Sequence, residues 1–112
     1  MDGSGSVADG LELRLMFPAG RDVTVEASGE LDLASAHHLR SALVHAATGT
    51  VAARVVVDLG GVVFMDSAGA KVLATMAEVL AADGRELVLC RATPAVERVL
   101  AAAGFRGVTT VG

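Results

Sequence analysis

The 112-residue chain has no tryptophan, no tyrosine, two prolines and a single cysteine. Because aromatic residues make up only 3%, the interior must be built from valine, leucine and alanine. The single Cys90 excludes a disulfide within the chain and favours a reducing compartment, and we expect it to be a small buried apolar residue. The length is typical of one domain, and 53% hydrophobic residues suffice for one core.

The chain also lacks any cluster of arginine or lysine, and its net charge is −4. Nucleic-acid binding needs a basic surface that displaces counterions from phosphates, so we expect no nucleic-acid partner. No uncharged apolar run reaches the ~18 residues of a membrane span. Residues 1–10 have neither the basic nor the apolar part of a signal peptide. The sequence therefore predicts a cytoplasmic protein without membrane insertion.

The first part of the chain predicts an antiparallel hairpin. Residues 1–9 are rich in glycine and serine, and we expect them to form a flexible leader before a domain over residues 10–112. Apolar and polar residues alternate over 11–17 and again over 23–28, which is the period of half-buried strands. The short Gly-containing connection between these strands indicates antiparallel pairing.

The rest of the chain predicts alternating helices and strands. The order β-β-α-β-α-β-α-β predicts a single-domain α/β sandwich with a mostly parallel sheet and an antiparallel N-terminal edge. After the hairpin we expect a helix capped by Asp32 or Ser35 and then a buried strand over 54–59. A loop over 60–65 leads to a second helix from near Ser67, which is followed by a strand over 86–91. The last elements are a helix that starts at Thr93-Pro94 and ends at Gly104, and a strand over 108–111.

The most informative segment is VVVDLGGVVFMDSAGAKVL, residues 55–73. Apolar residues 62–65 are expected to anchor the loop, and Asp66-Ser67 follows at the start of the helix. The first helical turn has free N–H groups and a partial positive charge, so a phosphate on an exposed Ser67 would find donors there. Serine is also a favoured N-cap residue, and the residues alone leave open whether Ser67 only caps the helix.

Three segments resemble STAS domains, in the right order over residues 10–112. They are GELDLASAHHLRSAL (29–43), VVVDLGGVVFMDSAGAKVL (55–73) and RATPAVERVLAAAGF (91–105). The resemblance implies a STAS-like sandwich and, for a stand-alone domain, an anti-sigma factor antagonist. In that family the matching serine, here Ser67, is phosphorylated by an anti-sigma factor with a histidine-kinase-like ATPase fold. Phosphorylation ends the binding to that kinase, and a PP2C-type phosphatase restores it.

The resemblance also implies a partner-binding surface. Asp66 matches the acidic residue before the phosphorylated serine, and Asp32 matches the aspartate after Gly-Glu-Leu. Ala70-Lys71 departs from the family, where a larger apolar residue and glycine are usual, so Lys71 adds a cation beside the loop. Small residues after Ser67 would leave room for a close partner. The expected contact residues are Asp32, Asp66, Ser67, Ala68, Gly69 and Lys71.

An enzyme is not expected, because no acid, base and nucleophile converge in the sequence. Asp58 ends a buried strand and is expected to accept hydrogen bonds from loop N–H groups. Ser67 lacks the G-x-S-x-G elbow of hydrolases. No cofactor or metal site is expected either. The remaining candidate metal ligands are histidines and methionines. We expect His37, His38 and His45 to lie on a solvated helix face, and Met65 and Met76 to pack in the core or anchor a loop.

An alternative function remains within the same family. STAS-like domains also occur as parts of transport complexes, where the serine need not be phosphorylated. The alternative is therefore a non-phosphorylated STAS subunit that stabilises an ABC-type lipid or anion transport complex.

Overall fold

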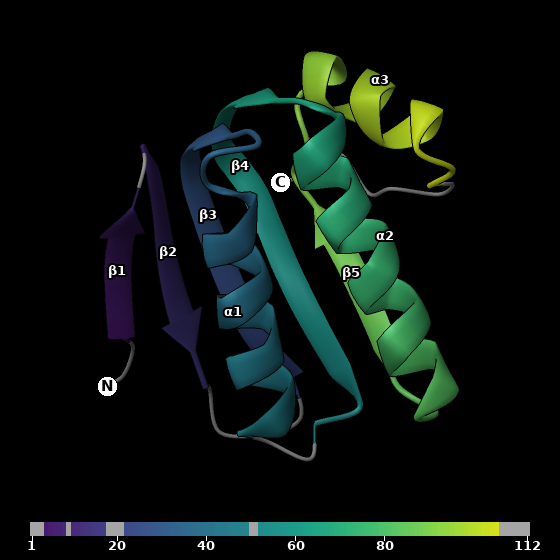
Figure 1. Ribbon diagram of the computed structural model, residues 1–112. Helices are drawn as coiled ribbons and strands as arrows, with labels where there is room; N and C mark the ends of the chain where they lie inside the picture. Colours follow the sequence, from purple (N-terminus) through teal and green to yellow (C-terminus); the bar gives the residue numbers. More distant parts are fainter. Residues whose placement is uncertain (1–3, 9, 18–21, 50–51, 106–112) are drawn as a thin grey trace.

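The computed structural model describes residues 4–8, 10–17, 22–49 and 52–105, which form a five-stranded sheet with three helices (Figure 1). The sheet order is β1-β2-β3-β4-β5, antiparallel from β1 to β3 and parallel from β3 to β5. The predicted hairpin and mixed sheet are confirmed, while the predicted strand over 108–111 lies outside the described residues. The elements are β1 (Ser4–Ala8), β2 (Leu11–Met16), β3 (Asp22–Leu31), α1 (Ala36–Thr48), β4 (Arg54–Met65), α2 (Ser67–Ala82), β5 (Glu86–Cys90) and α3 (Pro94–Ala102).

The N-terminal strand β1 occupies residues 4–8 of the stretch 1–9 that was expected to be a flexible leader, and the rest of that stretch lies outside the described residues. The strand pairs with β2 in a register that runs from Ser4 opposite Leu15 to Ala8 opposite Leu11. An edge strand is held by backbone N–H and C=O groups, which every residue of this stretch carries whatever its side chain. Composition alone therefore could not reveal this strand.

The hydrophobic core lies between the sheet and the helices α1 and α2, which cover one face of it (Figure 1). The alternation that predicted half-buried strands is confirmed, because every second residue of β2 and of most of β3 points into this core. The core is aliphatic, as the scarcity of aromatic residues required. Its fully buried members include Leu11, Leu13, Val23, Val25, Leu39, Leu43, Val55, Val57, Leu73 and Leu100.

Both ends of α3 follow the signals in the sequence. The N–H of Val96 donates to Thr93 Oγ1 at 3.3 Å, and Pro94 is the first helical residue. Gly104 adopts a left-handed conformation (φ 97°), after which the N–H of Phe105 donates to the carbonyl of Leu100 at 3.0 Å. The predicted cap, stop and fold-back of Phe105 are confirmed.

The strand β4 continues where the sequence predicted a loop over 60–65. Its pairing with β3 shifts register after Glu26, opposite Asp58, and shifts again after Gly29, opposite Val62, before it reaches Leu31, opposite Met65. The glycine pair therefore makes a bulge inside a strand rather than a turn that ends it. As a result β3 and β4 end side by side, and the two segments that follow them start from neighbouring points.

Candidate functional site: the surface around Ser67

Asp66 is the N-cap of α2. Its backbone is extended, and its Oδ1 accepts hydrogen bonds from the N–H groups of Ala68 (2.9 Å) and Gly69 (3.2 Å). Ser67 is the first residue of the helix, so the alternative in which Ser67 serves only as the cap is wrong. The expectation that a phosphate on Ser67 would find free donors also needs correction, because Asp66 already occupies these two amides.

Asp66 also ties the helix start to the turn after β3. Its Oδ2 accepts a hydrogen bond from the N–H of Leu33 at 3.2 Å, and its own N–H donates to the carbonyl of Leu31 at 3.1 Å. The half-buried carboxylate thus satisfies backbone donors from segments 33 residues apart in sequence. The sequence predicted Asp66 as a contact residue and gave no sign of this second, architectural role.

The turn between β3 and α1 is held by Asp32 and Ser35. Asp32 Oδ1 accepts from the N–H of Ser35 at 3.1 Å, while the N–H of Asp32 donates to Ser35 Oγ at 3.1 Å. The fully buried Ser35 hydroxyl donates to the carbonyl of Glu30 at 2.9 Å. Ser35 is the N-cap residue of α1, but its side chain makes no capping bond. These bonds give the turn, and the exposed Leu33 at its tip, a fixed position.

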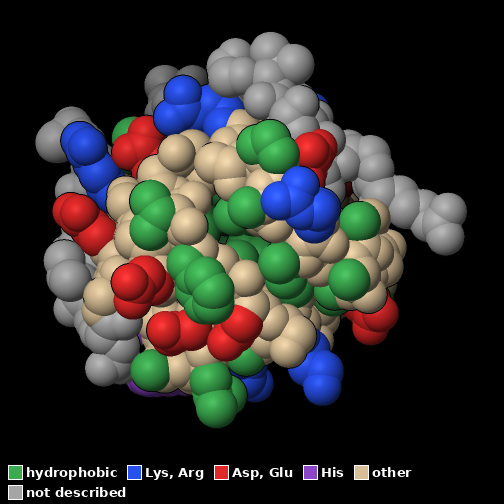
Figure 2. All heavy atoms as spheres, turned by 90° about the horizontal axis from the view of Figure 1, so that it is seen from above, with side chains coloured by type: hydrophobic (Ala, Val, Ile, Leu, Met, Phe, Trp, Pro, Cys, Tyr) green, Lys and Arg blue, Asp and Glu red, His purple; other side chains and the backbone are tan. Residues whose placement is uncertain are grey.

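Large apolar residues are exposed in the turn after β3 and in the last residues of β4. Leu33 is 78% exposed, Val63 76% and Phe64 50%, and Ser67, three residues after Phe64, is exposed as well. Figure 2 looks down on this end and shows hydrophobic side chains gathered near its centre with acidic ones next to them. We call Leu33, Val63, Phe64, Ser67 and Ala68 the Ser67 surface. Exposed apolar residues clustered in this way are typical of protein docking sites.

The four apolar residues 62–65 behave differently from the prediction that all of them anchor a loop. Val62 and Met65 are buried, but Val63 and Phe64 face solvent. The prediction is therefore right for the outer two and wrong for the inner two. The reason is a register shift between Gly29, opposite Val62, and Glu30, opposite Phe64, which leaves Val63 as an extra residue in β4. A strand without this bulge would alternate, whereas the extra residue puts two exposed side chains in a row.

Gly69 corrects another part of the predicted contact surface. The residue is buried, and a Cβ on it would lie 2.6 Å from Leu31 Cγ and 2.9 Å from the Leu31 carbonyl oxygen. Gly69 therefore allows α2 to approach the end of β3 and does not face a partner. Of the other expected contact residues, Ser67 and Lys71 are exposed, while Asp32, Asp66 and Ala68 are half-buried.

Replacing Asp66 by alanine should lower the free energy of unfolding by about 1–2 kcal/mol, because two amides of α2 lose their cap. Asp66→Asn is the matched control, since an amide oxygen can still cap the helix but one acceptor is lost for the N–H of Leu33. Urea denaturation measures both variants. Equal stability of Asp66→Ala and wild type would show that the carboxylate does not hold the helix start.

Asp58 lies on the sheet away from the Ser67 surface and has the structural role predicted for it. Its Oδ1 accepts from the N–H of Gly60 at 2.9 Å and pairs with Arg91 Nε at 2.9 Å. The sequence did not reveal the ion pair. It places the Arg91 guanidinium over Gly60, where an added Cβ would come within 2.5 Å of Nη2. The glycine in the bulge thus makes room for this contact.

Cys90 is half-buried, whereas a buried apolar residue was expected. Burial raises the pKa of the Cys90 thiol, the charge of Asp58 raises it further, and Arg91 acts in the opposite direction. We expect Asp58→Asn to lower the pKa of Cys90 and to speed its alkylation by iodoacetamide at pH 8, since the thiolate is the nucleophile. Asp22→Asn, on the neighbouring strand, is the control. A rate that falls in Asp58→Asn would contradict the electrostatic argument.

The histidines and methionines lie where the sequence placed them. His37 and His45 are exposed and His38 is half-buried, all on α1, and Met65 and Met76 are buried as predicted. Across the ranges that the structure describes, no three histidine, cysteine or acidic side chains come together in a way that could hold a metal ion.

The fold and this surface define a small α/β domain that exposes a helix start beside the end of a mixed sheet. The chain matches a family model described as "Mlab, STAS domain" over residues 18–110. The chain therefore belongs to the STAS domain family, and the resemblance inferred from the sequence is confirmed.

Solved structures agree with this assignment. An anti-sigma factor antagonist from Mycobacterium paratuberculosis is 27% identical with a TM-score of 0.75, over 88% of this chain and 82% of that one. The Bacillus antagonist SpoIIAA in its unphosphorylated form is 22% identical with a TM-score of 0.71, over 82% and 80%. The second likeness shows the shared fold alone, whereas the first supports a related role.

A third match comes from a membrane protein. The murine anion transporter Slc26a9 is 23% identical with a TM-score of 0.68, over 80% of this chain but only 15% of the transporter. Its likeness shows that the same fold also forms part of a transporter chain. In the present chain, none of the helices in the described ranges has the length and apolarity needed to cross a membrane.

Proposed function

We propose that this chain is a cytoplasmic anti-sigma factor antagonist that binds a serine-kinase anti-sigma factor when Ser67 is unphosphorylated. The kinase would have the histidine-kinase-like ATPase fold, and a PP2C-type phosphatase would reverse the modification. The observation that carries the proposal is the exposed Ser67 at the start of α2, which follows exposed Val63 and Phe64 in the chain and lies next to Asp66, the residue bonded to the N–H of exposed Leu33. A kinase can reach this hydroxyl, and a partner can cover the apolar side chains around it.

The surroundings of Ser67 explain how one phosphate could end the binding. A phosphoserine carries about −1.5 to −2 charges at neutral pH. The amides of Ala68 and Gly69 already bond the Asp66 carboxylate, so they do not neutralise the new group. The phosphate therefore stays at the surface, next to an existing negative charge. Burying it against an apolar partner would cost several kcal/mol even with the exposed Lys71, four residues later on α2, as its counter-charge, because both charges would leave water.

Incubation with candidate anti-sigma kinases and ATP, followed by mass-spectrometric mapping, tests the proposal. We expect a single phosphate on Ser67, and none on Ser67→Ala. Ser41→Ala, which alters an exposed serine of α1, is the matched control and should be phosphorylated like wild type. A kinase that binds the chain but modifies another residue, or none, would contradict the proposed switch.

The alternative, a non-phosphorylated subunit of an ABC-type lipid or anion transport complex, has one observation in its favour. The Slc26a9 match shows this fold within an anion transporter. The alternative predicts that the chain co-purifies with an ABC ATPase rather than with a sigma-factor regulator. It also predicts that Ser67→Ala and Ser67→Glu support the complex equally well.

A further inference from the structure

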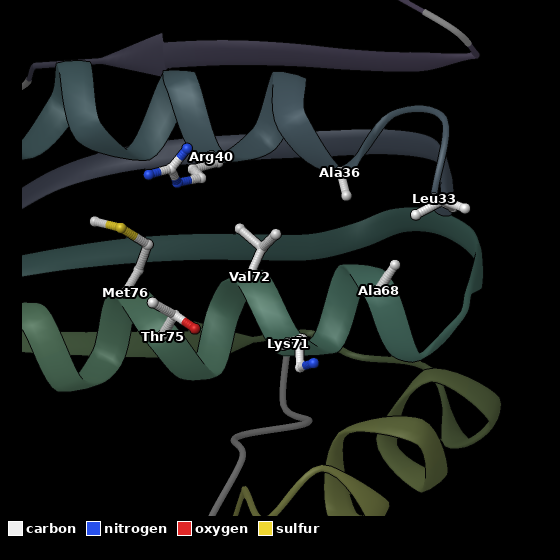
Figure 3. A pocket seen from close by; sticks show the side chains of 8 residues that line it. All are labelled: Leu33, Ala36, Arg40, Ala68, Lys71, Val72, Thr75 and Met76. Carbon is white, nitrogen blue, oxygen red and sulfur yellow. The ribbon is translucent and has the colours of Figure 1, made fainter.

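A groove of about 290 Å³ runs between α1 and α2, from the Ser67 surface toward the middle of both helices. Figure 3 shows Ala36 and Arg40 of α1 facing Ala68, Val72 and Met76 of α2 across it, with Leu33 at one end. Its lining residues are Leu33, Ala36, Arg40, Ala68, Lys71, Val72, Thr75 and Met76.

The groove is lined mainly by apolar atoms, and the small side chains of Ala36 and Ala68 leave it open at the end near Leu33. Ala36 and Met76 are buried, and Val72 is half-buried, so their exposed atoms form a floor rather than projecting ridges. Two neighbouring helices on one face of a sheet leave a groove of this kind for the side-chain ridge of a third helix. An amphipathic helix fills such a groove with apolar residues spaced by one helical turn.

The charges at the groove are of one sign, although the whole chain carries −4. Arg40 on α1 and Lys71 on α2 are both exposed at its walls, and no aspartate or glutamate lines it. Within the described residues, neither Arg40 nor Lys71 forms an ion pair. Two unpaired cations beside an apolar groove are complementary to a helix that carries carboxylates along both edges of its apolar face.

We propose that this groove binds an acidic amphipathic helix of the partner protein. The groove shares Leu33 and Ala68 with the Ser67 surface, so one partner can cover both without a gap. The assignment of this helix to an anti-sigma factor rests on the proposed function. The chemistry of the groove does not, because it depends only on its apolar floor and its two cations.

Lys71 connects the groove to Ser67. It lies four residues after Ser67 on α2, and side chains at this spacing are neighbours on a helix. A phosphate on Ser67 would attract the Lys71 ammonium and remove one of the two cations available to the acidic helix. Groove binding is therefore sensitive to the same modification.

The test uses the purified, unphosphorylated full chain and two designed amphipathic peptides of about 20 residues, a length at which isolated helices form. One carries leucine on one face and glutamate on the other, and the second has lysine in place of every glutamate. We expect the glutamate peptide to shift NMR resonances of α1 and α2 along the groove. Arg40→Glu and Lys71→Glu should each weaken its binding about tenfold or more, since one ion pair becomes a repulsion.

Arg98→Glu is the matched control, because it changes the same net charge on an exposed position of α3. It should leave the binding of the glutamate peptide within about twofold of wild type. Equal weakening by Arg40→Glu and Arg98→Glu, or equal binding of the lysine peptide, would overturn the proposal. So would dodecanoate shifting the groove resonances while the glutamate peptide does not, which would indicate an acyl-chain site. No kinase is present, so these outcomes do not depend on the phosphorylation of Ser67.

Discussion

Ser67→Glu is expected to weaken binding to the serine-kinase anti-sigma factor about 100-fold. The substitution places a carboxylate beside Asp66, whose own charge is already committed to the amides of α2. A partner that covers Leu33 and Phe64 would have to desolvate this added charge, and the Lys71 ammonium with it if the two form a pair. A loss of about 2.8 kcal/mol corresponds to the 100-fold change. Isothermal titration calorimetry with the purified kinase measures it.

Ser67→Ala provides the opposite case. It removes the phosphate acceptor without adding charge, so it should bind the kinase persistently, even in the presence of ATP. Ser41→Glu is the control for net charge, because it introduces the same carboxylate on an exposed position of α1 and should bind like wild type. If Ser67→Ala and Ser67→Glu both bind as wild type does, charge at residue 67 does not govern docking.

Much of the fold could be predicted because it depends on local periodicity. Alternation over 11–17 and 23–28 predicted β2 and β3, and the spacing of Leu39 and Leu43 predicted α1. The capping signals at Thr93 and Gly104 predicted both ends of α3, because they also depend on neighbouring residues alone. Each of these signals is contained within a few neighbouring residues.

The failures come from features that depend on distant partners. The glycine pair after Leu59 has the composition of a turn, but pairing with Ser28 to Leu31 keeps this stretch in β4. Residues 4–8 have no apolar alternation, but they still pair with β2 through the backbone. In both cases the deciding hydrogen bonds join segments whose proximity no local pattern reveals.

The candidate site shows the same division. Exposure of Ser67 at a helix start could be predicted, because Asp66-Ser67 precedes a helical pattern. The tether from Asp66 to Leu33 and the contact of Gly69 with Leu31 could not, since both depend on where β3 ends in space. The groove beside Lys71 required the side-by-side arrangement of α1 and α2, which the order of elements does not specify.

Gly69→Val should lower the free energy of unfolding by about 3 kcal/mol, near the upper end of the usual range for an overpacked core position. Its Cβ would lie 2.9 Å from the Leu31 carbonyl oxygen. That oxygen accepts a hydrogen bond from the N–H of Asp66 at 3.1 Å, so it cannot move away without breaking the link between β3 and α2. Helix propensity opposes this result, because valine is a better helix former than glycine. Thermal unfolding should show a decrease in Tm of roughly 10–20 °C.

Ala68→Val is the matched control, because it adds a branched side chain one residue earlier at a half-exposed position. Only the lower helix propensity of valine acts there, so the loss should stay below about 0.7 kcal/mol. If Gly69→Val is as stable as Ala68→Val, α2 can shift away from Leu31 at no cost. The start of α2, and with it the Ser67 hydroxyl, would then not be held at a fixed distance from the Asp32 turn. A partner that must contact both would find no preformed surface, so the stability of this one variant tests the rigidity on which docking depends.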